Sequence, residues 1–334
     1  MEIYKSRNSA VNIMVFVSAV LFISIYINPL ASYSKDLGFI LSSCLARLAA
    51  PFVFFTVGYS FFKNGADISA FVRKILVMYT IWTIVFNNEK VIQFRNAADW
   101  IAFAKKLVFT GVVYHLWIFP AIIFAVVLTY LLLKRMRIEG ILLVSAILYV
   151  LGLLGESYYG ITLRVPLLSD LYKTYLREFQ TTCNGLFFGF FFVAAGAFYS
   201  EKKRLPTVKK SSAVFLISLG LLLAEIFVLR NFGLAKDFNM LLFLMPAGMS
   251  LSLALLRAGT AERPIHIYLR NMGILTFCIH LMLIRFYEWL KDHSVFLENV
   301  NSLGKFLFVL ILSLVIAHNI ITITKKTEAI KWIC

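Results

Sequence analysis

The sequence predicts an all-α protein that crosses a membrane about ten times. Three observations predict this class: 60% of the 334 residues are hydrophobic, the mean hydropathy is +0.83, and apolar runs alternate with short charged connections. Lipid offers no hydrogen-bond partner to backbone groups, so a crossing segment must be a helix of roughly 17 to 25 mostly apolar residues. The predicted spans are residues 11–30, 38–62, 72–86, 113–133, 140–155, 184–199, 213–229, 238–256, 271–290 and 303–324.

The distribution of Lys and Arg predicts the orientation of these spans. The N-terminus, the even-numbered connections and the C-terminus carry 19 of these residues, and the odd-numbered connections carry 11. The densest cluster lies within residues 202–210. Because cytoplasmic connections retain positive charge, both termini are expected in the cytoplasm.

The composition excludes several classes of protein. A net charge of +16 is typical of nucleic-acid binders, but the hydrophobic content rules out an ordinary soluble binder, and the basic excess suits anionic membrane lipid instead. The first apolar run is long enough to remain as the first span, so no cleaved signal peptide is expected. Residues 1–334 are predicted to form a single membrane domain. Its longest connections, residues 87–112 and 156–183, are expected outside as partly ordered lids.

The four cysteines carry no pairing or metal-binding pattern. Two lie within predicted spans, and none has CxxC spacing. We expect apolar thiols without a disulfide framework and no metal site. The cysteines are Cys44, Cys183, Cys278 and Cys334.

A few ionisable residues fall inside predicted spans, where hydrocarbon makes charge costly. Arg47 lies near mid-depth of the second span, and Glu225 lies in the outer part of the seventh. His280 is near the middle of the ninth, with Arg285 further out, and His115 opens the fourth. With both termini inside, all five lie between mid-membrane and the outer surface. They predict a polar cavity that opens outward.

Each of these residues also has a structural interpretation. His115 and its neighbour Trp117 suit an aromatic belt at the membrane interface. Arg285 can extend its charged end to the outer interface, and His280 can be a hydrogen-bonded core residue. Arg47 is the deepest charge, so it is expected to be functional or part of a buried pair.

Several stretches resemble signature segments of the acyltransferase-3 family of bacterial membrane proteins. The second span carries RLAAPFVFFTVGYSFFK over residues 47–63, and the fourth opens with YHLWIFP over residues 114–120. A basic pair, Arg73 and Lys74, begins the third span, and residues 270–280 end in TFCIH. Ten helices with both ends inside also agree with this family.

Within that family, the chain is most similar to the membrane half of the serine racemases of vancomycin resistance. The similarity lies in residues 114–117, 147–161 and 184–188. Those racemases continue into a soluble domain that uses pyridoxal phosphate on a lysine. No such domain occurs before Cys334, so racemase activity is not assigned to this chain, and a separate or fused racemase is an expected partner.

The resemblance implies transfer of an acetyl group from cytoplasmic acetyl-CoA to an envelope acceptor, such as a glycan, at the outer side of the bacterial plasma membrane. A histidine would activate the acceptor hydroxyl as a general base. Arg73 and Lys74 would hold the phosphates of the coenzyme, or would only be part of the positive cytoplasmic charge.

The first span departs from the family pattern. The family carries an acid, an arginine and a histidine where this chain has Asn12, Val15 and Tyr26. A tyrosine with a pKa near 10 is a poor base at neutral pH, so the first span by itself does not predict acyl-transfer activity. The predicted catalytic residues are therefore His115 and His280, together with Tyr26 at the histidine position.

Two further functions compete with acyl transfer. The chain could admit L-serine, with Arg47 facing the carboxylate and Glu225 facing the ammonium group. Trp117 and Arg285 complete the predicted substrate-binding set. The third hypothesis is a degenerate scaffold that only binds a partner within the membrane.

Overall fold

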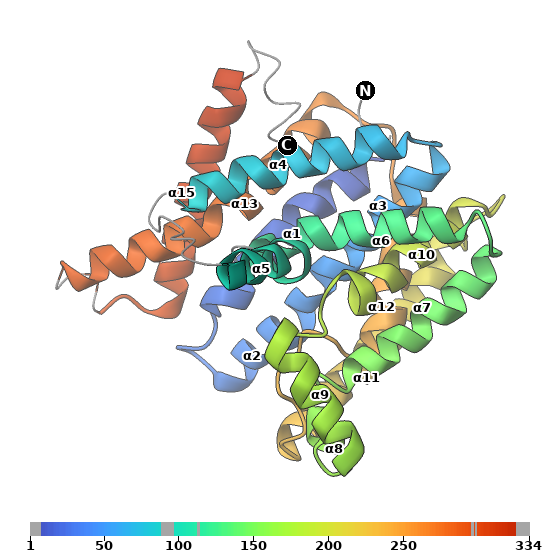
Figure 1. Cartoon of the computed structure of the whole chain (residues 1–334). Helices are drawn as coiled ribbons and strands as arrows, with labels where there is room; N and C mark the ends of the chain where they lie inside the picture. The colour runs from blue at the N-terminus through green and yellow to red at the C-terminus, as the bar shows by residue number, and fades with distance from the viewer. Residues whose placement is uncertain (1–7, 88–96, 112–113, 295–296, 298, 325–334) are drawn as a thin grey trace. The chain divides into compact units, whose positions relative to one another are not determined.

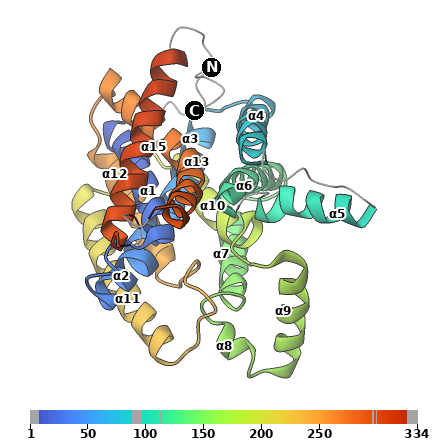
Figure 2. The same cartoon turned by 90° about the vertical axis from the view of Figure 1, so that its left-hand side faces the viewer.

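The computed structural model describes residues 8–87, 97–111, 114–294, 297 and 299–324. Within these ranges the secondary structure is helical and contains no strand, which confirms the predicted all-α class. The chain divides into two compact units, residues 50–257 and residues 6–49 with 258–334, whose helices are drawn in Figures 1 and 2.

Seven helical segments of the described chain are long and apolar enough to cross a membrane. Three shorter apolar helices, Ile138–Leu153, Gly185–Ser200 and Leu244–Ala258, fall on the fifth, sixth and eighth predicted spans. Each predicted span thus overlaps an apolar helix, and the polytopic membrane class is confirmed. The number of crossings and the side of the termini stay predictions. The seven segments are Ser9–Ile27, Lys35–Lys63, Ile68–Phe86, His115–Leu132, Val208–Asn231, Pro264–Asp292 and Ser302–Thr324.

The unit of residues 6–49 and 258–334 is built on α1 (Ser9–Ile27), α13 (Pro264–Asp292) and α15 (Ser302–Thr324). The Asn8 side chain begins α1 by accepting hydrogen bonds from the next turn of backbone, as N-cap residues do. α1 and α13 start side by side and pack along their length. A Cβ atom on Gly273 would lie 2.7 Å from the Cα of Phe16, so the glycine permits this close approach.

The same unit contains an irregular helical stretch. After α2 (Lys35–Ile40), the chain forms a π-helical turn, η1 (Leu41–Leu45), and a 3₁₀ turn, η2 (Ala46–Leu48). Such turns occur often at functional sites, because they change the direction of side chains within a helix. Arg47 lies within this stretch.

The unit of residues 50–257 is a helical bundle in which α10 packs on α6 and α7. Gly196 of α10 faces the backbone of α3 so closely that a Cβ atom would lie 2.3 Å from the Phe55 carbonyl oxygen. The spanning helices are α3 (Ala49–Lys63), α4 (Ile68–Asn87), α6 (Ile118–Leu132), α7 (Ile138–Leu153), α10 (Phe190–Ser200), α11 (Val208–Asn231) and α12 (Leu244–Ala258).

The two longest connections contain helices of their own. Residues 156–183 form α8 (Tyr159–Thr162) and α9 (Pro166–Phe179), which lie beyond the end of α7 in Figure 2. Within residues 87–112, α5 (Ala97–Lys105) continues into the π-helical turn η3 (Lys106–Thr110). The predicted partial order of both connections is confirmed, whereas their outward placement stays a prediction.

Cys44, Cys183 and Cys278 are buried thiols outside any disulfide, and Cys334 lies outside the described residues.

Candidate functional site

Two of the predicted catalytic residues meet in the unit of residues 6–49 and 258–334. Tyr26 lies in the last turn of α1, and His280 lies in the middle of α13. Their ring centroids are 5.4 Å apart, with the planes inclined at 48°. Tyr26 is half-buried, whereas His280 is completely buried.

The hydrogen bonding of His280 fixes its tautomer. Its Nδ1 atom lies 2.6 Å from the carbonyl oxygen of Phe277, one turn earlier on α13. A carbonyl oxygen only accepts hydrogen bonds, so Nδ1 carries the proton and Nε2 is the basic nitrogen of the neutral ring. The Phe277 ring packs on Phe22 of α1, with centroids 4.9 Å apart, and holds this part of α13 against α1. The arrangement gives a positioned base beside a phenol.

The other two positions at which the first helix departs from the family pattern have structural partners. The amide nitrogen of the fully buried Asn12 donates a 2.6 Å hydrogen bond to the carboxylate of Glu262. A carboxylate from just before α13 therefore lies beside the position of the missing acid. Val15 is buried on the same helix and contributes apolar packing.

Arg47 and Arg285 belong to the same unit but have different surroundings. The Nε atom of Arg47 donates to the carbonyl oxygen of Ser42, inside the π-helical turn, and the residue is half-buried. Arg285 is exposed on α13, five residues after His280 and so on another face of the helix. Glu288, a potential partner of Arg285, forms an ion pair with Lys305 instead.

His115 and Trp117 lie in a 3₁₀ turn, η4 (Tyr114–Trp117), that opens α6 in the other unit. The buried His115 ring packs against Phe86 of α4, with centroids 4.8 Å apart. Trp117 stacks on Phe54 at 5.8 Å and meets Phe188 edge-on at 5.9 Å. Both residues thus lie among aromatic side chains that join α3, α4, α6 and the turn before α10.

Glu225 of α11 is a structural anchor in this unit. Its carboxylate accepts hydrogen bonds from the backbone nitrogens of Leu242 at 2.7 Å and Phe243 at 2.9 Å. The hydroxyl of Tyr158 donates a third, at 2.9 Å. Burial, followed by the adjacent Glu225 carboxylate, raises the pKa of Tyr158 well above its ordinary value, so this hydroxyl keeps its proton. The carboxylate therefore ties the connection before α12 to the connection after α7.

Glu156 is a second buried acid, which sequence reasoning missed. It follows α7 and is fully buried, and its Oε1 atom accepts hydrogen bonds from the Thr181 hydroxyl and the Thr182 backbone nitrogen. Burial and the neighbouring Asp237 carboxylate raise its pKa to about 8. In the sequence, Glu156 is one acid at the end of an apolar run, and its partner Asp237 lies far along the chain, so no local pattern identifies the pair.

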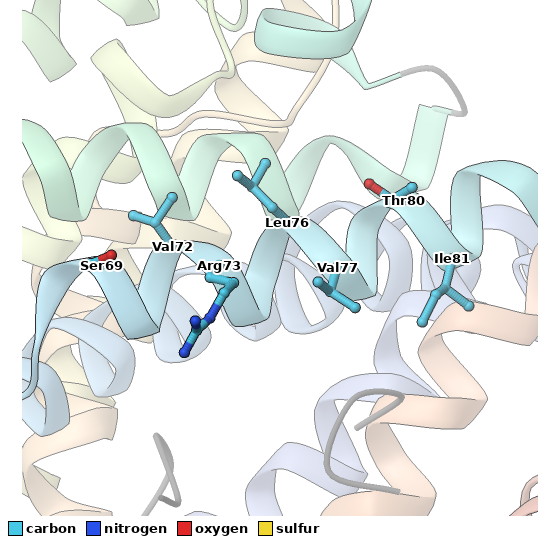
Figure 3. A pocket seen from close by; sticks show the side chains of 7 residues that line it. All are labelled: Ser69, Val72, Arg73, Leu76, Val77, Thr80 and Ile81. Carbon is cyan, nitrogen blue, oxygen red and sulfur yellow. The ribbon is translucent and has the colours of Figure 1, made fainter. Parts of the chain in front are cut away.

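Arg73 lies beside a shallow hollow on α4, shown in Figure 3. Lys74 does not line the hollow, because successive helix residues point in directions about 100° apart. The predicted contact of Arg73 and Lys74 with coenzyme phosphates stays a prediction. The hollow is lined by Ser69, Val72, Arg73, Leu76, Val77, Thr80 and Ile81.

The predicted site residues are divided between the two units. Tyr26 and His280 come together in one unit, which also contains Arg47 and Arg285. Glu225, His115 and Trp117 belong to the other unit, as does the Arg73 and Lys74 pair. A single cavity shared by all of them stays a prediction.

Comparison with known proteins gives racemases as relatives. An amino-acid racemase of Enterococcus faecalis is 29% identical over 72% of this chain and 34% of its own length, and a second one from that species is 26% identical over 98% of the chain and 48% of its own. A serine/alanine racemase of Enterococcus gallinarum is 27% identical over 71% of the chain and 36% of its own length. The chain therefore spans less than half of each relative. No solved structure matches significantly.

A family model described as an acyltransferase domain matches residues 6–318. The matched range includes most of both units and the Tyr26 and His280 positions. The chain therefore belongs to this family of acyltransferases, as a polytopic membrane member whose relatives include amino-acid racemases.

Proposed function

We propose that the chain transfers an acyl group, such as acetyl, from cytoplasmic acetyl-CoA to a hydroxyl group of an envelope component at the outer side of the bacterial plasma membrane. The observation that carries this proposal is the contact between Tyr26 and His280. In the family resemblance the base is a histidine at position 26, and here an imidazole from α13 lies beside that position.

The reaction follows from the tautomer of His280. Its Nε2 atom takes the proton of the acceptor hydroxyl as the oxygen attacks the thioester carbonyl. The C–S bond then breaks, the acyl group remains on the oxygen as an ester, and the proton leaves with the coenzyme thiolate. The Nδ1 hydrogen bond to Phe277 holds the ring during this transfer. Arg73 is the residue proposed to bind the coenzyme phosphates, with Lys74 adding positive charge nearby.

Acyl transfer is tested with purified protein in lipid nanodiscs, acetyl-CoA and an extract of envelope acceptors. His280→Gln is expected to lower turnover by about 100-fold or more, because a general base contributes about that much. The matched control is His318→Gln on α15, where the histidine is exposed and bonds to Tyr268. Turnover that survives His280→Gln unchanged would refute this assignment of the base, and absence of acetyl-CoA binding would refute acyl transfer.

A second candidate function, passage of L-serine, is favoured by the relatives, one of which is a serine/alanine racemase. Arg47 would bind the carboxylate of the amino acid. The sequence predicts that Glu225 binds the ammonium group, but its carboxylate already accepts three hydrogen bonds, so we expect recognition to depend on Arg47. Uptake of labelled serine that is equal with and without Arg47→Ala would exclude this role for Arg47.

A further inference from the structure

A polar cluster around the buried Glu156 joins three connections in the unit of residues 50–257. We call it the Glu156 cluster. The backbone nitrogen of Lys236 donates to the Glu156 carbonyl oxygen at 3.0 Å, and the Lys236 ammonium donates to the Gln180 carbonyl oxygen at 2.8 Å. The connections after α7, after α9 and after α11 thus meet at one point. The cluster consists of Glu156, Thr181, Thr182, Lys236 and Asp237.

The two carboxyl oxygens of Glu156 differ in their hydrogen bonding. Oε1 accepts from the Thr181 hydroxyl and from the Thr182 backbone nitrogen. Oε2 is buried, and the described residues offer it no hydrogen-bond donor. The neighbouring group is the carboxyl of Asp237, whose Oδ1 atom accepts from the Asn239 backbone nitrogen. Two acceptors face each other, and a buried acceptor without a donor is costly.

The groups around Glu156 do not compensate for two adjacent carboxylates, one of which is buried. Lys236 is exposed, and its ammonium is already bonded to the Gln180 carbonyl oxygen. Tyr175 of α9 also faces Glu156, but burial raises the pKa of its phenol, which stays neutral and accepts a hydrogen bond from the Asn184 amide. A proton between the two carboxyl groups supplies the missing donor and removes one charge at once.

We propose that Glu156 and Asp237 share one proton at neutral pH. This carboxyl–carboxylate hydrogen bond is a pH-sensitive contact that holds the connection after α7 to the connection after α11. A raised pKa of Glu156 agrees with the geometry. When the proton leaves, two carboxylates repel each other inside the cluster, and the connections separate. Thr182, whose backbone nitrogen donates to Glu156, is followed by Cys183. The Cys183 residue is 8% exposed while the contact is formed, and it becomes accessible when the cluster opens.

Infrared spectroscopy of the whole chain in nanodiscs tests the shared proton directly. We expect the carbonyl stretch of a protonated carboxylic acid at about pH 7, and we expect it to vanish at about pH 10, above the raised pKa. Glu156→Gln should lack the band at both pH values, whereas Glu139→Gln should keep it. Glu139 is a matched control because it is an exposed acid of the same unit, paired with Arg137. A wild-type spectrum without the band overturns the proposal. A sodium ion bound between the two carboxyl groups in place of the proton also overturns it.

Labelling of Cys183 tests whether the shared proton holds the two connections together. Because thiol reactivity itself rises with pH, the labelling rate of the wild type is compared with that of Glu156→Gln at each pH. The glutamine amide can donate to Asp237 at any pH, so the ratio of wild-type to variant rates should rise about tenfold over the roughly two pH units in which the shared proton changes from mostly bound to mostly lost. A ratio of labelling rates that stays constant with pH overturns the pH-sensitive contact. Should Glu156→Gln fail to fold, Asp237→Asn serves instead, since its amide donates to Glu156 in the same way.

Discussion

The ring of Tyr26 lies against the ring of His280, with 5.4 Å between centroids, where two adjacent helices of one unit pack together. The family resemblance implies a histidine on the first helix at the tyrosine position. In this chain the neighbouring imidazole comes from α13, and its Nδ1 hydrogen bond to Phe277 leaves Nε2 as the basic atom. Although α1 has no histidine at position 26, the imidazole of His280 therefore lies next to that position.

Tyr26→His is predicted to raise acyl-transfer turnover by about tenfold or more, because it adds a second base close to His280. Tyr26→Phe is the control, since it keeps an aromatic ring against His280 and adds no base. Turnover is measured with acetyl-CoA and a pooled envelope acceptor. A Tyr26→His protein that folds but turns over no faster than Tyr26→Phe would show that position 26 is not next to the reacting groups.

The helices could be predicted from sequence because lipid requires every crossing segment to satisfy its own backbone hydrogen bonds. Each apolar run therefore had to be helical, whatever its neighbours. The helix ends were predicted less closely. The predicted spans begin at residues 11 and 213, whereas the helices begin after the caps Asn8 and Thr207, whose side chains accept from backbone nitrogens of the first turn of α1 and of α11 (Val208–Asn231). The fifth and sixth predicted spans are short, and they correspond to two of the three shorter apolar helices of the structure.

The site residues were harder to predict, because their roles depend on helix register and on distant backbone. Glu225 has the sequence signature of a substrate-binding acid, namely a charge inside an apolar span. Two of its three hydrogen-bond donors are the backbone nitrogens of residues 242 and 243, and no side-chain pattern in the sequence identifies a backbone donor. The contact between Tyr26 and His280 depends on how far α13 is shifted along α1, which a single sequence does not contain.

Glu225→Gln is predicted to destabilise the protein by about 1 to 3 kcal/mol, because hydrogen bonds to a charged acceptor become bonds to a neutral one or are lost. Thermal unfolding in detergent measures the effect. Tyr158→Phe removes only one of the three hydrogen bonds and should cost about 1 kcal/mol. Equal stability of Glu225→Gln and the wild type would contradict the role of Glu225 as an anchor.

Gly196→Ala is predicted to separate α10 from α3. The added methyl group would lie 2.3 Å from the Phe55 carbonyl oxygen and 2.6 Å from the Tyr59 nitrogen, both rigid backbone atoms. We expect a loss of about 1 to 3 kcal/mol, typical of overpacking. Gly220→Ala on α11 is the matched control: no atom lies within 4 Å of its added Cβ, so helix propensity should leave stability unchanged or raise it by up to about 1 kcal/mol. The two variants are compared by thermal unfolding, and a Gly196→Ala protein as stable as Gly220→Ala would contradict the close approach.

The raised pKa of Glu156 predicts how stability depends on pH. The folded chain keeps the Glu156 proton up to about pH 8, whereas an unfolded chain releases it near the ordinary value of 4.5. Between these values the folded state binds more protons than the unfolded state, so stability falls as pH rises, and the loss is complete above the folded pKa. Each pKa unit corresponds to ~1.4 kcal/mol, so the decline is measurable as a fall in the thermal midpoint. Glu156→Gln has no proton to lose and should flatten this decline, while Glu139→Gln should retain it. A wild-type midpoint that rises over the same interval relative to Glu156→Gln would mean that the folded state stabilises the ionised carboxylate, which is the opposite of what its burial beside Asp237 requires.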